Sequence, residues 1–244
     1  KPKVVFAPHV ETSAGMILPD DYIRQLGKAT RDVGGLLVLD CIASGTIWAD
    51  MTDLNVDILI TAPQKGWSGS PCAGIVMLGE RALEKLPTTQ NTSFACNLAK
   101  WLQIMQAYEQ GKHAYHATMP TDALKTFRDV IIEAQQYGVE KLKQNQQELG
   151  KRIRSLLEQK GFKSVAAKNV QSPSVIVSYT NNPTIKNGSA FAQVGIQIAA
   201  GVPLQCNEPE GFQTFRLGLF GLDKLKNIDR TVSLLEDAFQ NITP

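Results

Sequence analysis

Asp40 and Lys65 are two residues of opposite charge that end or follow apolar segments, GLLVLD (35–40) and VDILITAP (56–63). In open α/β sheets, ligands bind beyond the carboxyl ends of the strands, which is where both side chains would lie. A lysine that is partly desolvated there loses some of its preference for the charged form, and its neutral amine can attack a carbonyl carbon to form a Schiff base. Either residue alone is more often a strand end in solvent, but two opposite charges at one edge favour a reactive site.

Pyridoxal phosphate chemistry requires both residue types. A lysine amine binds the aldehyde of the cofactor, and an anion facing the pyridine nitrogen keeps the ring protonated and able to accept the electrons of a carbanion. Lys65 is followed by Gly66, Gly69 and Gly74, which allow a bulky ligand or another backbone to approach closely. Asp40, Lys65 and this loop therefore have the residue types that such a site needs.

The segments around these residues alternate between the periods of strands and helices. Continuous apolar runs predict buried strands in KVVFAPH, GLLVLDC, VDILITAP and AGIVMLGE. The stretch 18–34 predicts a helix, because Pro19 and two acids begin it, apolar residues share one face, and glycines end it. Unbroken apolar strands separated by a helix predict an α/β fold, with a mostly parallel sheet and helices on both of its faces.

The rest of the chain predicts long helices and then a second α/β unit. Helical patterns cover 97–110 and 121–160, and the second is divided near Gly138. After Gly161 come SVIVSYT, a helical stretch at 185–194, GIQIAAGV, TFRLGLFG and an amphipathic helix, DKLKNIDRTVSLLEDAF. We expect residues 1–135 to belong to a large domain and residues 136–244 to form a small C-terminal α/β domain.

Composition narrows the class of protein. The 244 residues are 43% hydrophobic and carry a net charge of +2, so neither nucleic acid nor an anionic membrane is indicated as a partner. No apolar run approaches the length of a membrane span. The four cysteines are dispersed without a Cys-x-x-Cys motif, which argues against a zinc site or a disulfide framework and predicts a reducing, cytoplasmic location. They are Cys41, Cys72, Cys96 and Cys206.

Five segments together resemble one family. They are, in chain order, HVETSAGMILP, LLVLDCIASGT, DILITAPQKGWSGSPCAGIVML, AYHATMP and FRLGLFG. Over essentially its whole length the chain is similar to the class V aminotransferases, which are pyridoxal-phosphate enzymes of fold type I, and particularly to the alanine–glyoxylate / serine–pyruvate group. The resemblance implies transfer of an amino group between a small amino acid (alanine or serine type) and a 2-oxo acid (glyoxylate or pyruvate type).

The same resemblance implies a role for each matching residue. Lys65 would form the Schiff base with pyridoxal 5'-phosphate, and Asp40 would hold the pyridinium nitrogen. Thr12 would bind the cofactor near its 3-hydroxyl, and Gln64 would reach the phosphate. Ile42 would pack on one face of the ring, although an isoleucine at a strand end is equally an ordinary core residue.

Three further positions complete the implied site. Tyr115 and Thr118 match residues that contact the phosphate from the partner subunit, so the resemblance implies a homodimer with shared sites. Those two residues also fit a turn before a helix with Thr121 as its N-cap. Arg216 matches the arginine that binds the substrate carboxylate. Its planar fork suits a bidentate carboxylate, and an arginine between Phe215 and Leu217 is costly to bury unpaired.

Two alternatives remain open from the sequence. One is a lyase or desulfurase of the same fold, for which Cys206 in PLQCNEPEG is the cysteine to consider, although its Cys-Asn-Glu context does not resemble the desulfurase loop. The other is an inactive structural fragment of such an enzyme. The chain begins at Lys1, and the family's N-terminal portion, with its phosphate loop and stacking aromatic, has no counterpart here. We therefore expect an exposed apolar sheet edge and face, self-association, and weak cofactor binding by this chain alone.

Overall fold

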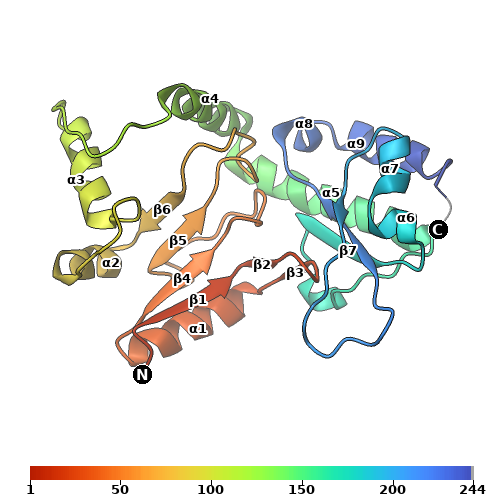
Figure 1. Cartoon of the computed structure of the whole chain (residues 1–244), viewed down its shortest axis with the longest axis horizontal. Helices are drawn as coiled ribbons and strands as arrows, with labels where there is room; N and C mark the ends of the chain where they lie inside the picture. Colours follow the sequence, from red (N-terminus) through yellow and green to blue (C-terminus); the bar gives the residue numbers. More distant parts are fainter. Residues whose placement is uncertain (243–244) are drawn as a thin grey trace.

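The structure is a computed structural model that describes residues 1–242, and it has two sheet-centred regions joined by long helices (Figure 1). The first region holds a four-stranded sheet in the order β1-β4-β5-β6. Strands β1, β4 and β5 are parallel neighbours, and β6 runs antiparallel to β5. A small antiparallel ribbon of β2 and β3 follows β1. The strands are β1 (Val4–Pro8), β2 (Val10–Glu11), β3 (Met16–Ile17), β4 (Leu36–Asp40), β5 (Ile58–Thr61) and β6 (Ile75–Leu78).

Helix α1 (Asp20–Asp32) covers one face of this sheet and packs against β4. It begins after Pro19, and its first turn carries two aspartates, whose charge suits the positive end of the helix dipole. Ile23 is completely buried and joins the core of the first region. The other buried members of that core are Ala7, Leu37, Leu39, Cys41, Leu54, Val56 and Leu59.

The second region is built on an antiparallel sheet in the order β7-β9-β8. Four phenylalanines, Phe162, Phe191, Phe215 and Phe239, pack in its core with ring centroids 5.0 to 5.7 Å apart. The elements are β7 (Val175–Tyr179), α6 (Pro183–Lys186), α7 (Ser189–Gln193), β8 (Ala199–Ala200), β9 (Thr214–Gly218), α8 (Leu222–Leu225) and α9 (Ile228–Ala238).

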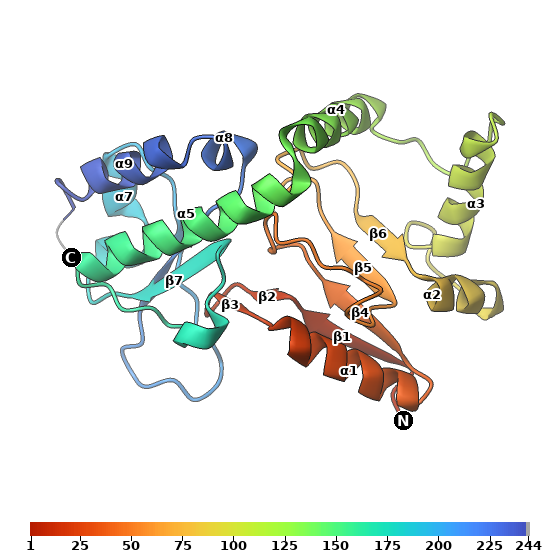
Figure 2. The ribbon, with the colours of Figure 1, turned by 180° about the vertical axis from the view of Figure 1, so that it is seen from behind.

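Long helices join the two regions. Gly138, with a φ of +106°, separates α4 from α5, because this backbone conformation cannot continue a helix. Figure 2 shows α5 running from the end of α4 along the second sheet. The connecting elements are α2 (Glu80–Lys85), η1 (Leu86–Thr88), α3 (Leu98–Glu109), α4 (Thr121–Tyr137), α5 (Val139–Gln159) and η2 (Lys168–Val170).

The predicted α/β fold class is confirmed, and so are the helices at 97–110 and 121–160 with their division at Gly138. Two predicted helices are each broken in two. The stretch 185–194 is interrupted at Gly188, which has a φ of +81°. The C-terminal helix is interrupted at Asn227, whose side chain accepts the N–H of Arg230 and so begins α9. The domain boundary at 135/136 stays a prediction.

The edge strand β1 exposes apolar side chains. Phe6 is 72% exposed and Val4 is 42% exposed, on the face of β1 opposite to the buried Ala7. This confirms the prediction of an open apolar edge and face in the first sheet. In the part of the chain that the structure describes, no helix is both long and apolar enough to cross a membrane.

Candidate active site

Asp40 and the Lys65 loop follow neighbouring parallel strands. Asp40 ends β4 opposite Ile60 of β5, and the N–H of Cys41 donates to the Ile60 carbonyl at 2.8 Å. Lys65 lies five residues after Ile60, in the turn that follows β5. Since parallel strands end at the same edge of a sheet, the two loops that carry these residues leave β4 and β5 side by side, as the sequence predicted.

The two loops also touch beyond the strands. A Cβ atom on Gly66 would lie 2.0 Å from the carbonyl oxygen of Gly45, so only glycine allows this close approach of two backbones. The prediction that Gly66 permits another backbone to come close is therefore confirmed. A Cβ atom on Gly69 would lie 3.1 Å from the ring of Phe127 in α4, whereas one on Gly74 would have nothing within 4 Å.

The loop after Asp40 is held by residues from the second region. Gln146 of α5 is completely buried, its side-chain N–H groups donate to the carbonyls of Pro173 and Leu219, and its Oε1 accepts the N–H of Thr46. Ser174 Oγ donates to the Ala43 carbonyl at 2.7 Å. Sequence reasoning missed Gln146. Its spacing from Leu142 and Leu149 places it on the buried apolar face of α5, and a polar residue on that face indicates a buried hydrogen-bonding role.

The aspartate itself retains free acceptor capacity. Asp40 Oδ1 accepts the N–H of Ile42 at 2.9 Å. Oδ2 makes no hydrogen bond or ion pair within residues 1–242. Asp40 is half-buried. A carboxylate oxygen at the strand edge is thus available to a ligand.

Lys65 is half-buried and lies against an aromatic ring. Its Nζ is 5.6 Å from the ring centroid of Phe220, which follows β9. In the same loop, Ser68 Oγ accepts the N–H of Leu222 at 2.7 Å. The lysine loop therefore contacts the chain that leaves β9, the strand on which Arg216 lies.

Arg216 is anchored by one nitrogen only. It pairs with Val177 and Ala199 in the second sheet, and its Nε donates to the Ala200 carbonyl at 2.8 Å. Among the described residues it forms no other hydrogen bond and no ion pair, so both Nη groups remain available to a carboxylate. Its charge does act on Glu11 in the first region.

Thr12 lies in a turn that Glu11 stabilises. The Glu11 carboxylate accepts the N–H groups of Ser13 at 2.8 Å and Ala14 at 2.7 Å. Partial burial raises the pKa of this carboxyl, whereas these hydrogen bonds and the charge of Arg216 lower it by a larger amount. The pKa of Glu11 is therefore below its usual value. Thr12 makes no side-chain hydrogen bond to another described residue, which leaves its hydroxyl available.

The structure gives fewer contacts between the remaining predicted site residues and Asp40 or Lys65. Ile42 is half-buried in the loop after Asp40, and Gln64 is exposed beside Lys65. Tyr115 and Thr118 lie in exposed coil between α3 and α4, and their hydroxyl oxygens are 3.1 Å apart. Within residues 1–242, these two residues make no hydrogen bond to Asp40 or Lys65, and their role from a partner subunit stays a prediction.

His9 and Cys41 are buried next to Asp40 and hold the loop that follows it. His9 Nδ1 lies 2.8 Å from Ser44 Oγ and 3.8 Å from Cys41 Sγ. Burial lowers the pKa of His9 to about 4 and raises the pKa of Cys41 to about 12. Both are therefore uncharged near neutral pH, and they fix the loop after β4. Cys206 lies in an exposed loop where its N–H donates to Glu208.

This donor set fits pyridoxal phosphate. A lysine amine and a carboxylate with a free oxygen leave the same sheet edge, and the unpaired Thr12 hydroxyl lies beyond the neighbouring strand β1. The close Gly45–Gly66 contact fixes the two loops that carry the amine and the carboxylate. These are the groups that the cofactor requires.

Comparisons with known proteins decide the family. A profile described as Aminotransferase class-V matches residues 1–218. The chain belongs to the class V aminotransferase family. It is 27% identical, over 94% of its length, to a 2-aminoethylphosphonate–pyruvate transaminase of Vibrio parahaemolyticus serotype O3:K6. It is 23% identical, over 99% of its length, to an alanine–glyoxylate aminotransferase of Oryctolagus cuniculus.

Solved structures show the same fold. An alanine–glyoxylate aminotransferase from Nostoc sp. superposes with a TM-score of 0.78 at 22% identity, over 98% of this chain and 62% of that one. The chain spans 61% of the length of each of the two curated relatives named above. The fold is therefore that of the pyridoxal-phosphate aminotransferases of fold type I, in part.

Proposed function

We propose that the whole protein catalyses a pyridoxal-phosphate-dependent transamination in which Lys65 and Asp40 are the catalytic residues. The observation that carries the proposal is the placement of a lysine amine and a free carboxylate oxygen beyond two neighbouring parallel strands, in a chain of the class V aminotransferase family. The relatives named above are aminotransferases, and the Cys-Asn-Glu context of Cys206 does not resemble a desulfurase loop.

Each residue has a defined task in this proposal. Lys65 would hold the cofactor through its Nζ, and its amine, when free, would take the proton from the substrate Cα as a general base. Asp40 would face the ring nitrogen with its free carboxylate oxygen and favour the protonated ring. When bound, the cofactor supplies the electron sink for the carbanion. Thr12 would bind near the 3-hydroxyl, Gln64 would bind the phosphate, and Ile42 would pack on the ring.

The substrates proposed are a small amino acid and a 2-oxo acid, used in two successive half-reactions. The free Nη groups of Arg216 bind the α-carboxylate that both substrates share. The relatives named above use pyruvate or glyoxylate according to their names, which supports a small 2-oxo acid as acceptor. We propose alanine or serine as the amino donor.

Borohydride reduction of the purified whole protein with pyridoxal phosphate tests the proposal. Reduction makes the lysine–cofactor bond permanent, so the cofactor mass should map to the peptide that contains Lys65. Lys85, which is exposed at the end of α2, is the control and should carry no label. Labelling of another lysine, or of none, contradicts the assignment of Lys65.

We propose further that the protein is a homodimer in which Tyr115 and Thr118 contact the phosphate of the partner's site. Mixing two inactive variants tests this arrangement. Lys65→Ala subunits and Tyr115→Phe/Thr118→Val subunits should each be poorly active, whereas mixed dimers contain one intact site and should regain activity. If the mixture is no more active than its components, the two residues serve their own subunit's site or none.

A further inference from the structure

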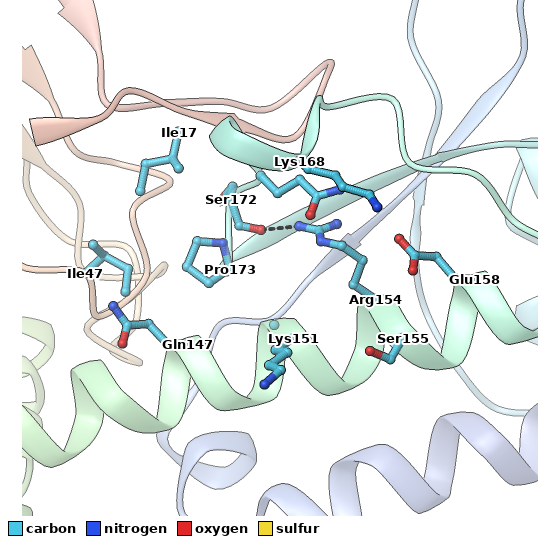
Figure 3. A pocket seen from close by; sticks show the side chains of 12 residues that line it. Ile17, Ile47, Gln147, Lys151, Arg154, Ser155, Glu158, Lys168, Ser172 and Pro173 are labelled. Carbon is cyan, nitrogen blue, oxygen red and sulfur yellow. Dashed lines mark hydrogen bonds between the residues drawn. The ribbon is translucent and has the colours of Figure 1, made fainter. Parts of the chain in front are cut away.

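A cavity lies away from Asp40 and Lys65, between α5 and the segment 168–173 (Figure 3). Its volume is about 510 Å³, and apolar residues of the first region, Ile17 and Ile47, form one wall. None of the residues that we assign to cofactor or substrate lines it. The cavity therefore needs an explanation separate from the proposed transamination.

Arg154 is the residue that makes this cavity unusual. It is 9% exposed, and its Nη2 donates to the Ser172 carbonyl at 2.6 Å. Its Nη1 is buried without a hydrogen-bond partner, and Arg154 joins no ion pair within residues 1–242. A buried guanidinium with an unpaired N–H is unfavourable unless an acceptor, best a charged one, approaches it.

The other charged residues of the cavity leave an excess of positive charge. Lys151 and Lys168 line it together with Arg154, against one carboxylate, Glu158. Glu158 attracts Arg154 electrostatically, but none of these four residues forms an ion pair with any other described residue. Figure 3 shows Arg154 reaching from α5 toward Ser172, with Lys168 beside it on the opposite segment and Glu158 further along α5.

The wall around Arg154 is held in place before any ligand binds. A Cβ atom on Gly150 would lie 2.5 Å from the Cα of Pro173, so α5 and this segment are in tight contact. The hydroxyls of Ser172 and Ser174 lie 3.0 Å apart and are both buried. These contacts fix the backbone around Arg154, and the guanidinium must turn so that its buried Nη1 meets a ligand in the cavity.

We propose that this cavity binds a small phosphorylated anion, either inorganic phosphate or a phosphate monoester. The phosphate oxygens would accept hydrogen bonds from Arg154 and Lys168, whose charges match a dianion better than a single carboxylate. Any apolar group of a monoester would face Ile17 and Ile47. The site would be separate from the phosphate contacts that Gln64 supplies in the proposed active site.

Calorimetric titration of the purified whole protein, saturated with pyridoxal phosphate, with inorganic phosphate and with phenyl phosphate, in dilute buffer without other multivalent anions, tests the proposal. Tighter binding of phenyl phosphate identifies a monoester as the ligand class, and tighter binding of inorganic phosphate identifies the free ion. Either result supports the site. No measurable binding of both probes overturns it.

Four variants locate the binding. Arg154→Met should weaken it about tenfold, and Lys168→Met about threefold. Glu158→Gln should tighten binding about threefold, because it removes the only carboxylate that faces the ligand among the described residues lining the cavity. Lys163→Met is the matched control, since Lys163 is an exposed lysine near this segment but outside the cavity, and it should change affinity less than about twofold.

If Arg154→Met unfolds, the variants at Lys168 and Glu158 still test the proposal. Lys168 and Glu158 are both exposed, so their variants should keep the far-ultraviolet circular dichroism of the parent chain. Opposite changes in affinity at these two positions are expected of an anion site and not of a structural role. Binding that neither variant alters would overturn the proposal.

Discussion

The first sheet carries the proposed chemical groups in loops beyond its strands, whereas the second sheet carries the proposed substrate anchor, Arg216, within a strand. The packing of the two sheets differs as well. Phe6 of the first sheet is 72% exposed, and Phe215 of the second is completely buried among other phenylalanine rings. The better-packed sheet therefore holds the proposed substrate anchor, and the more open sheet precedes the loops that carry the proposed catalytic residues.

The second region also stabilises the loops of the first. Gln146 and Ser174 bond to the loop that follows Asp40, and Leu222 bonds to the loop that follows Lys65. Loops have few interactions of their own and depend on such contacts for a fixed geometry. The comparison indicates that substitutions in the second core should disturb the active site, while substitutions at the open edge of β1 should not.

Lys65→Ala should have the largest effect on activity. In the whole protein, we expect kcat to fall by about 10⁵-fold or more, since the variant lacks both the covalent bond to the cofactor and the general base. Within the described residues Lys65 makes no side-chain hydrogen bond or ion pair, only the contact with the Phe220 ring, so the fold should be retained. Steady-state kinetics with thermal unfolding as a control measure both quantities, and more than a trace of activity would disprove the role.

Phe215→Ala and Phe6→Ala compare how much each sheet's packing contributes to the free energy of unfolding. Removal of the buried Phe215 ring should lower the free energy of unfolding by about 3–5 kcal/mol. Removal of the exposed Phe6 ring should change it by less than about 0.5 kcal/mol. Urea unfolding of both variants measures the difference, and equal losses would show that a partner covers Phe6.

Asp40→Asn should lower kcat by about 10²–10³-fold, because an amide cannot hold the ring nitrogen in its protonated form. The amide oxygen can still accept the N–H of Ile42, so the loop should keep its geometry. Cofactor binding, followed by absorbance, should persist. If the variant transaminates at the parent rate, Asp40 is only a strand terminus.

His9 should make stability depend on pH. Its pKa is lowered from 6.5 to about 4 in the folded state, so the unfolded chain binds more protons between these values. The contribution of neutral His9 is complete above about pH 6.5 and is lost as the pH falls toward 4, up to about 3 kcal/mol. Urea unfolding at several pH values measures this slope. His9→Gln should flatten it and His113→Gln, at an exposed position, should not.

Arg216→Lys should have the smallest effect. We expect KM to rise about tenfold for the amino acid and the 2-oxo acid alike, because an ammonium cannot match a carboxylate with two parallel bonds. The value of kcat should change much less than in Lys65→Ala. An unchanged KM for both substrates would assign Arg216 a structural role through its bond to Ala200.

The sequence by itself determined the local elements and supplied the prediction of Asp40 and Lys65 as reactive groups. Periodicity marked the strands before Asp40 and Lys65, and Gly138 marked the division between two long helices. These features depend on neighbours in the chain and on what φ angles a residue can adopt, so they can be read without a structure. The breaks at Gly188 and Asn227 were missed because their apolar patterns continue through the interruption.

Tertiary structure alone decided which distant residues stabilise and surround the site. Thr46 and Gln146 are 100 residues apart in sequence, and Ser68 and Leu222 are 154 apart, yet each pair is hydrogen-bonded. The unpaired Nη1 of Arg154 is equally invisible in a helical pattern, because its burial comes from packing against Ser172. Such contacts depend on how whole elements pack, and a hydrogen bond across 100 residues leaves no local periodicity from which it could be predicted.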